Sequence, residues 1–205
     1  MAYLCAIMVK EVTGKTIEEL FRTPIIQQTA YWSKVKSHFG MESMAFNFVL
    51  YKEEEIVLRD LVVFIKNVDK DYSVAYVPYG PESEPEKEEQ GALLEELSVH
   101  LKEYLPPGCI MIRYDLVWES LWADDPEYKT EQGIWLGPPS PGAQEVRFNY
   151  STASGNFRKS PTNILPSNTV LVNLDIDASE ILGRMKPKTR YNIALSARKG
   201  VNVRV

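Results

Sequence analysis

Apolar residues alternate with polar ones, or gather in short β-branched and aromatic runs, at five places in the first part of the chain. Each of these places predicts a β-strand. The expected strands are residues 2–9, 44–51, 56–65, 72–78 and 109–116. The second and third of them are separated by the run Lys-Glu-Glu-Glu, which predicts a hairpin. Pro78 ends the fourth strand.

Two segments between these strands have helical features. Residues 24–38 predict a helix with Pro24 in its first turn and Gly40 just beyond its end. Residues 87–104 carry apolar side chains at helical spacing, and a Pro-Pro-Gly run terminates them.

The pattern changes after residue 138. Residues 138–166 are rich in Gly, Pro, Ser, Thr and Asn and lack a sustained apolar period, which indicates a linker or an exposed excursion. Beyond it, the chain predicts in turn a strand over 168–175, a short helix to Met185 with a capping box at Asp177 and Glu180, a helix over 189–199, and a strand from 201.

This order of elements predicts an α+β protein with a mostly antiparallel, mixed sheet flanked by helices, because strands and helices do not alternate regularly. We expect a first lobe over 1–145, a linker or exposed excursion over 146–166, and the beginning of a second lobe over 167–205. The second lobe looks incomplete, because the chain ends within an expected strand.

Composition places the protein among ordinary globular chains. Of its 205 residues 44% are hydrophobic and 25% charged, which argues against a disordered or fibrous chain. The sequence predicts neither a signal peptide nor a membrane-spanning segment. Cys5 and Cys109 form no zinc motif, and we expect both to be reduced thiols.

Charge is unevenly distributed. The net charge is −5, which argues against a surface that tracks nucleic acid throughout. Glutamates dominate residues 82–96, where a solvated loop leading into a helix is the simplest interpretation. Residues 183–205 carry seven Lys or Arg and no acid. An anion site should therefore be local and near the C-terminal end.

Several kinds of chemistry have no motif in the sequence. There is no G-x-S-x-G elbow, no phosphate-binding loop, no H-E-x-x-H and no Gly-x-Gly pair. With only two histidines and two cysteines, we expect no metal site. The residues that could act in catalysis are not identified by any pattern.

The basic tract offers the best candidate site. Thr189 precedes the expected helix, and Lys186, Lys188 and Arg190 surround its positive end, which suits a phosphate or carboxylate. Arg190 is the strongest of these residues, because a guanidinium can bind phosphate through two hydrogen bonds. The alternative interpretation is a solvated helix start that is merely basic.

Two further candidates lie in the first part of the chain. Lys34 and Lys36 are two positions apart on the helix expected over 24–38 and so point to different faces. Tyr79 belongs to a rigid Pro-Tyr-Gly-Pro turn and could be either a surface aromatic or a cleft wall.

Three stretches resemble the FemA/FemB/FemX family of tRNA-dependent aminoacyltransferases. They are QQTAYWSKVKSHFG at 27–40, AYVPYGP at 75–81 and NTVLVNLDIDASEILGRMKPKTRYNIALSARKGV at 168–201. The third stretch is the most specific. The family turn often reads Pro-Arg-Gly-Pro, so Tyr79 stands here where the family has a basic residue.

The resemblance implies two acetyltransferase-like (GNAT) lobes and an enzyme of cell-wall biogenesis. Such an enzyme moves an amino acid from aminoacyl-tRNA to the peptide of a peptidoglycan precursor and so builds the interpeptide bridge. The precursor would be UDP-muramoyl pentapeptide or its lipid-linked form. In the family, a lysine and an arginine of the resembling stretches hold this precursor, and they match Lys36 and Arg190 here. The resemblance therefore implies that Lys36 and Arg190 bind the precursor. The second-rank candidates are their neighbours Lys34, Tyr79, Lys186 and Lys188.

The resemblance also implies which groups are not needed. The tRNA ester is already activated, so no protein nucleophile, acetyl-CoA or other cofactor is expected. We expect a location in the bacterial cytoplasm, including peripheral contact with lipid-linked precursor at the inner face of the membrane, and little activity from these 205 residues alone. Two alternatives remain, a non-catalytic anion- or tRNA-binding module and a CoA-dependent acetyltransferase; the glycine spacing argues against the second.

Overall fold

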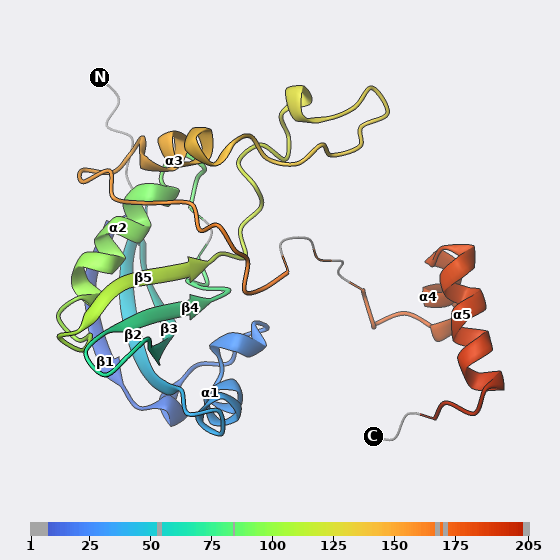
Figure 1. Ribbon diagram of the computed structural model, residues 1–205, viewed down its shortest axis with the longest axis horizontal. Helices are drawn as coiled ribbons and strands as arrows, with labels where there is room; N and C mark the ends of the chain where they lie inside the picture. Colours follow the sequence, from blue (N-terminus) through green and yellow to red (C-terminus); the bar gives the residue numbers. More distant parts are fainter. Residues whose placement is uncertain (1–7, 53–54, 84, 167–168, 170–171, 203–205) are drawn as a thin grey trace. The chain divides into compact units, whose positions relative to one another are not determined.

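The computed structural model describes residues 8–52, 55–83, 85–166, 169 and 172–202 (Figure 1). The chain divides into two compact units, Met1–Leu165 and Pro166–Val205, called unit 1 and unit 2 below.

Unit 1 is built on one five-stranded sheet, with its strands side by side in chain order. The strands are β1 (Met8–Lys15), β2 (Glu42–Lys52), β3 (Glu55–Asn67), β4 (Ser73–Pro78) and β5 (Cys109–Asp115). The first four pair antiparallel, and β5 runs parallel to β4. The predicted α+β class, with a mixed sheet flanked by helices, is confirmed.

The predicted hairpin is the longest pairing of the sheet. β2 and β3 are in register from Glu42 opposite Ile65 to Lys52 opposite Glu55. Their β-branched and aromatic residues suit a pleated surface that is covered on both sides. Successive side chains of a strand point to opposite faces of the sheet. Residues 61–65 of β3 are all apolar and buried, so both faces of the sheet are apolar there.

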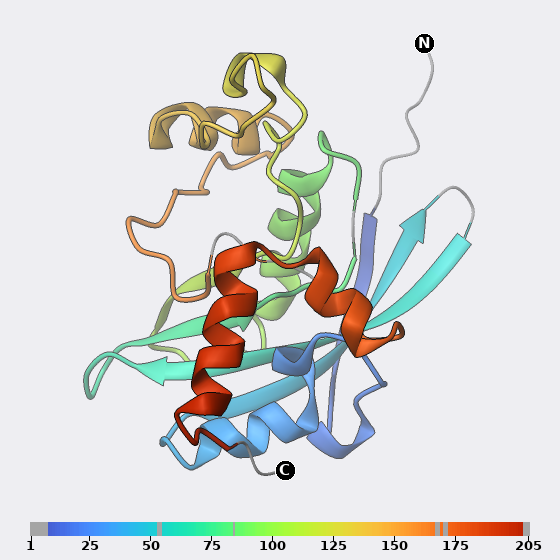
Figure 2. The ribbon, with the colours of Figure 1, turned by 90° about the vertical axis from the view of Figure 1, so that its right-hand side faces the viewer.

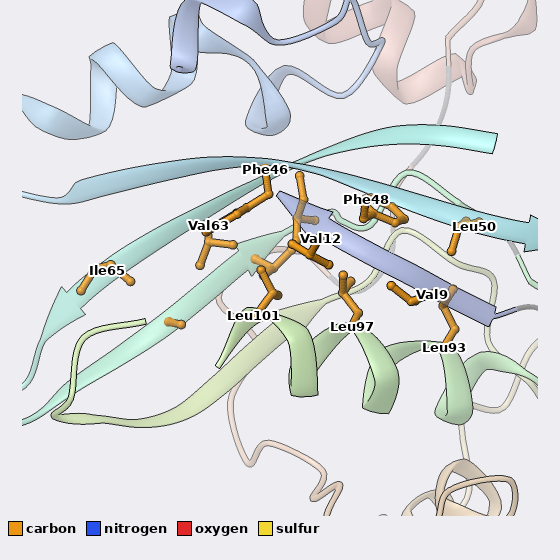
Figure 3. Packing of buried hydrophobic residues seen from close by; sticks show 13 residues of the cluster. Val9, Val12, Phe46, Phe48, Leu50, Val63, Ile65, Leu93, Leu97 and Leu101 are labelled. Carbon is orange, nitrogen blue, oxygen red and sulfur yellow. The ribbon is translucent and has the colours of Figure 1, made fainter. Parts of the chain in front are cut away.

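One face of the sheet packs against α2 (Gln90–Leu101), which confirms the helix expected over 87–104. Leu93, Leu97 and Leu101 recur along one side of α2 and are fully buried (Figure 3). They meet the inward residues of the strands, among them Phe46 and Phe48. Each buried leucine contributes about 1.5–3 kcal/mol of transfer free energy.

The other face carries α1 (Ala30–Ser37) and a smaller apolar cluster (Figure 1). The cluster joins Val62, Phe64 and Tyr76 of the sheet to residues of the α1 region that include Trp32. Because α1 and α2 cover opposite faces, unit 1 has three layers.

The helix expected over 24–38 is shorter in the structure. α1 begins at Ala30, and a separate 3₁₀ turn, η2, covers Ile26–Gln28, so the prediction that Pro24 lies in the first helical turn is wrong. The hydroxyl of Thr29 accepts a hydrogen bond of 3.2 Å from the backbone N–H of Trp32. This cap sets the helix start.

The first strand runs later than expected. β1 continues to Lys15 through an irregular register between Val9 and Glu11, while residues 2–7 of the strand expected over 2–9 lie outside the described residues. A 3₁₀ turn, η1 (Ile17–Glu19), follows β1 and is held by a capping box between Thr16 and Glu19.

The stretch expected to be a linker or exposed excursion contains a helix. α3 (Pro141–Asn149) begins with Ser140 as its cap and Pro141 in its first turn, and a further 3₁₀ turn, η3, covers Pro126–Tyr128. A helix thus lies within the range expected to be a linker or an exposed excursion. The Ser-Pro start signal is hidden among many other serines and prolines.

Three glutamates of the acidic run hold other parts of unit 1 in place. Glu88 pairs with Arg147 of α3. Glu95 accepts hydrogen bonds from the backbone N–H groups of Ala153 and Ser154, at 2.6 and 2.8 Å. Glu96 accepts one from the backbone N–H of Val9 at 2.6 Å. Glu88 is nevertheless a solvated side chain, 61% exposed, whereas Glu95 and Glu96 are half-buried and bind the backbone of other segments.

Unit 2 consists of two helices joined by a short turn (Figure 2). α4 spans Ala178–Arg184 and α5 spans Pro187–Arg198. Residues 172–175 form no strand, and 167–168 and 170–171 lie outside the described residues, as do 203–205 of the expected terminal strand. Among the described residues of unit 2 none is buried.

The side chain of Asp177 caps α4, accepting a hydrogen bond of 2.7 Å from the backbone N–H of Ser179. Glu180, expected to complete a capping box, instead bonds Arg184 one turn later, at 2.5 Å.

Two smaller findings concern sequence expectations. No helix within the described residues is long and apolar enough to cross a membrane. Cys109 is a free thiol of intermediate exposure, and Cys5 lies outside the described residues.

Candidate functional site

Lys36 lies on the side of α1 that carries Trp32. Its ammonium group is 5.1 Å from the centre of the Trp32 ring, a cation–π contact, and the residue is half-buried. Trp32 itself packs against the sheet. No carboxylate lies within salt-bridge distance of Lys36 among the described residues. Lys36 is thus a positioned cation without a carboxylate counter-ion among the residues that the structure describes.

Lys34 lies on another side of α1, which agrees with the two-residue spacing. It is exposed and lines a shallow groove with Tyr31, Val35, His38 and Phe39. Tyr31 and Phe39 are among the exposed large side chains of the helix region. Lys34 and Lys36 therefore do not share a site.

Tyr79 lies at the point where β4 leaves the sheet. Its backbone is in the left-handed region, with φ 49°, and its N–H donates a hydrogen bond of 2.6 Å to the carbonyl oxygen of Asp115. A cis bond joins Gly80 to Pro81 directly after it. The Pro-Tyr-Gly-Pro turn is thus fixed to the end of β5.

A partly buried polar network holds the end of β5. The carboxylate of Asp115 accepts hydrogen bonds from the hydroxyl of Tyr76 (3.0 Å), the Nε of Arg113 (3.1 Å) and the backbone N–H of Leu165 (3.2 Å). Burial, and secondly the charge of Asp115, raise the pKa of Tyr76 above its ordinary value. These residues fasten the end of unit 1 to the sheet.

The basic candidates of unit 2 share the first turn of α5. The helix begins at Pro187, two residues earlier than expected, and Lys186 is its cap residue. The backbone N–H groups of Thr189 and Arg190 both donate to the carbonyl oxygen of Lys186. Because α5 begins at Pro187, these two N–H groups are already bonded within the helix rather than free to bind an anion.

Arg190 has a structural contact that the sequence pattern did not predict. Its Nη1 donates hydrogen bonds to the carbonyl oxygens of Gly183 (3.1 Å) and Met185 (2.7 Å) at the end of α4. The side chain thereby joins α4 to α5. Nε and Nη2 make no hydrogen bond to another described residue and lie on an exposed side chain.

The predicted site residues therefore fall into two groups. Lys34, Lys36 and Tyr79 belong to unit 1, where only Lys34 lines one of the two hollows described for this part of the chain, while Lys186, Lys188 and Arg190 gather at one helix start in unit 2. No group of three or more histidine, cysteine, aspartate or glutamate residues that could hold a metal ion occurs within the described part of the chain.

A cleft that none of these residues lines opens beside β3, and we call it the β3 cleft. Its volume is about 420 Å³, and its walls come from residues 21–23, 28, 58–60, 82–83 and 117–118. Cavities of about 300–1,000 Å³ are typical of ligand sites. No local sequence pattern indicates this cleft, because its walls come from five separate segments.

Gln28 closes one end of the β3 cleft, where β3 and β4 diverge. Its Oε1 accepts a hydrogen bond of 2.7 Å from the N–H of Val62, and its Nε2 donates one of 2.7 Å to the carbonyl oxygen of Pro78. The residue is buried. A side-chain amide thus bridges two strands whose backbones no longer meet.

Asp60 anchors one wall of the β3 cleft. Its carboxylate accepts hydrogen bonds from Lys15 (3.1 Å), from the side chain of Asn47 (2.6 Å) and from the backbone N–H of Phe21 (2.5 Å). The Lys15 and Asp60 side chains are only 8% and 12% exposed. This cluster fixes residues 21–23 and with them Arg22.

Arg59 and Trp118 lie on other parts of the wall. The Nη1 of Arg59 donates to the carbonyl oxygen of Leu58 at 3.2 Å, and the indole N–H of Trp118 donates to that of Ser83 at 2.5 Å. Neither Arg22 nor Arg59 forms a salt bridge with another described residue.

Comparison with known proteins gives no assignment. No family model matches the chain, and neither the curated proteins nor the solved structures contain a match.

Proposed function

We propose that this chain is the precursor-binding part of an aminoacyltransferase of the FemAB type, acting in formation of the peptidoglycan interpeptide bridge. Its fold would be an acetyltransferase-like lobe in unit 1 and the beginning of a second in unit 2. The three stretches that resemble the family support this proposal. The mixed sheet of unit 1, with helices on both faces, is compatible with such a lobe.

The arrangement of Lys36 over Trp32 carries the proposal. A precursor that bears UDP or a lipid diphosphate needs a cation at a fixed position. The Lys36 ammonium has no carboxylate beside it in the described part of the chain, so it is available to bind phosphate oxygens. The indole ring limits the freedom of the lysine chain, so that less side-chain entropy is lost when the phosphate binds.

The resemblance assigns precursor contact to Arg190 of unit 2 as well. Nη1 is occupied at the end of α4, so a phosphate would bind through the exposed Nε and Nη2 of the same guanidinium. Lys186 and Lys188 lie in the same turn and would add to the local positive potential.

The proposed chemistry needs no nucleophile from the protein. The aminoacyl ester of tRNA is attacked by the amine of the acceptor peptide, an amide bond forms, and the ester bond to the tRNA hydroxyl breaks. The enzyme would align the two substrates and stabilise the developing oxyanion. No cofactor belongs to this proposal.

Calorimetric titration of the full chain with UDP-muramoyl pentapeptide tests it. We expect the parent to bind and Lys36→Met to bind about tenfold more weakly, since a charge-assisted hydrogen bond is lost. Lys34→Met is the matched control, because it removes the same charge from the exposed side of the same helix, and it should change nothing.

Two results would overturn the proposal. One is a folded parent that does not bind the precursor. The other is equal loss of affinity in both lysine variants, which would mean that net charge rather than position matters. Salt-sensitive binding to RNA without precursor binding would instead favour the non-catalytic anion- or tRNA-binding module.

A further inference from the structure

β3 loses its neighbouring strand halfway along its length. The pairing of β3 with β4 ends at Phe64 opposite Tyr76, and Gln28 occupies the next position at Val62. From Leu61 back to Glu55 no strand within the described residues pairs with β3 on that side. β2 and β3 continue beyond β4, with β1 paired along the other side of β2 (Figure 2).

The backbone groups of this open edge face the β3 cleft. The N–H of Val62 points toward Gln28, and backbone direction alternates along a strand, so the N–H and C=O groups of Asp60 and Leu58 point to the same side. The Leu58 carbonyl oxygen accepts from Arg59, and no backbone partner of the Leu58 or Asp60 N–H occurs on this side within the described residues.

The space beside this edge is where a longer β4 would pair. β4 ends at Pro78, and the chain turns away at Tyr79, whose φ is 49°. Residues 82–83 then form part of the cleft wall, with residues 58–60 of β3 on the other side. An open strand edge inside a cleft is the arrangement used to bind extended peptides by strand addition.

Charge in the β3 cleft selects the kind of peptide. Arg22 lies beside Asp60, on the α1 face of the sheet. Arg59 precedes Asp60 on β3, and side chains of successive strand residues point to opposite faces, so Arg59 belongs to the α2 face. Asp60 is neutralised by Lys15, which leaves Glu82 as the acidic side chain opposite two arginines. Successive residues of an added strand would point one to each arginine.

We propose that the β3 cleft binds an extended peptide with carboxylates on adjacent residues, which pairs as a strand with Leu58 and Asp60. Arg22 and Arg59 would each bind one carboxylate, and Phe21 and Trp118 would flank the peptide chain. The inference goes beyond the proposed function, because it concerns a cleft that neither Lys36 nor Arg190 lines.

The test uses the full chain and acetyl-Ala-Ala-Glu-Glu-Ala-Ala amide as the probe. Amide hydrogen exchange followed by NMR should show exchange slowed about tenfold or more at Leu58 and Asp60. The N–H of Arg59 already points toward β2, opposite Phe48, and should not change. Slower exchange at Leu58 and Asp60 but not at Arg59 distinguishes pairing of the peptide as a strand from a general stabilisation of the protein.

Matched peptides and variants separate the two kinds of contact. Replacing both glutamates of the probe by glutamine, or making Arg22→Gln and Arg59→Gln, should weaken binding about tenfold, because charge-assisted hydrogen bonds are lost. Both arginines are exposed, so these variants should fold. Lys34→Gln should have no effect. N-methylation of the peptide amides that face β3 should abolish binding, while methylation of the alternate amides should not.

Three outcomes would overturn the inference: no protection at Leu58 and Asp60, equal effects of the two methylation patterns, or displacement of the peptide by inorganic phosphate, which would make the arginines a simple anion site. The probe contains no nucleotide or sugar. Peptide binding here and precursor binding at Lys36 can therefore fail independently.

Discussion

Gly91 in α2 lies directly against the carbonyl oxygen of Phe148 in α3. A β-carbon at residue 91 would be only 2.0 Å from that oxygen, far inside van der Waals contact. Glu88, on the preceding turn, pairs with Arg147 of the same helix. The close packing of α3 against α2 therefore requires glycine, which has no side chain, at residue 91.

We predict that Gly91→Ala detaches α3, because the new methyl group and the backbone carbonyl cannot both keep their places. Alanine favours the helical conformation of α2 itself by up to about 1 kcal/mol, so α2 should persist. Hydrogen exchange should become faster at residues 141–149 and stay unchanged in β2. Unchanged exchange in α3 would contradict this account.

Gln28→Ala should lower the free energy of unfolding by about 1–3 kcal/mol, since the N–H of Val62 and the carbonyl of Pro78 lose a buried partner. Gln27→Ala, at a half-buried neighbour in the same turn, is the control. Urea denaturation of both variants measures the difference. If the two losses are equal, the bridge between β3 and β4 contributes nothing.

Lys15→Met should destabilise unit 1 by about 3–5 kcal/mol, because it leaves the little-exposed carboxylate of Asp60 without its counter-ion. Adding Asp60→Leu to this variant should recover part of the loss, since no unpaired charge then remains. Thermal or urea unfolding of the two proteins tests the coupling. A double variant that is less stable by the sum of both single effects would refute it.

Stability should fall as the pH rises above about 10, the ordinary pKa of tyrosine. Burial raises the pKa values of Tyr76 and Tyr114 in the folded protein. As the pH rises, the unfolded chain therefore loses these protons before the folded protein does, and the free energy of unfolding decreases. Tyr114→Phe should lose less stability than the parent between about pH 8 and about pH 11. Urea midpoints that fall equally in both proteins would rule out this contribution.

Arg190→Ala should loosen α4 from α5, because the carbonyl oxygens of Gly183 and Met185 lose their donor. Circular dichroism should show reduced helical content, whereas Lys188→Ala, an exposed charge in the same turn, should leave it intact. For ligand binding, Arg190→Lys is thus a better variant than Arg190→Ala, which mixes a structural with an electrostatic effect.

Much of unit 1 could be predicted from local pattern. β2, β3 and α2 have periods that match the faces they bury, and their positions follow from apolar spacing alone. The start of α1 could not be predicted in the same way. The Thr29 cap sets that start, and the 3₁₀ turn that replaces the expected earlier helical turns ends at Gln28, whose buried side chain contacts Val62 and Pro78, far away in sequence.

The candidate site was predictable only in part. The two-residue spacing correctly placed Lys34 and Lys36 on different sides of the helix. The contacts of Arg190 with carbonyl oxygens leave no sequence signal, because every residue has a backbone carbonyl group. The β3 cleft needs the ends of several elements together, and residues such as Arg22 and Trp118 meet there only after the sheet has formed.

The contacts of α2 impose an order on local opening within unit 1. Gly91 and Glu95 support α3 and the loop after it, while Glu96 binds β1 on the sheet side. When α2 opens, residues 141–157 lose their support, yet these residues can detach while α2 stays folded on the core. The peripheral segment is therefore a dependent cooperative unit, whose opening free energy cannot exceed that of the helix beneath it.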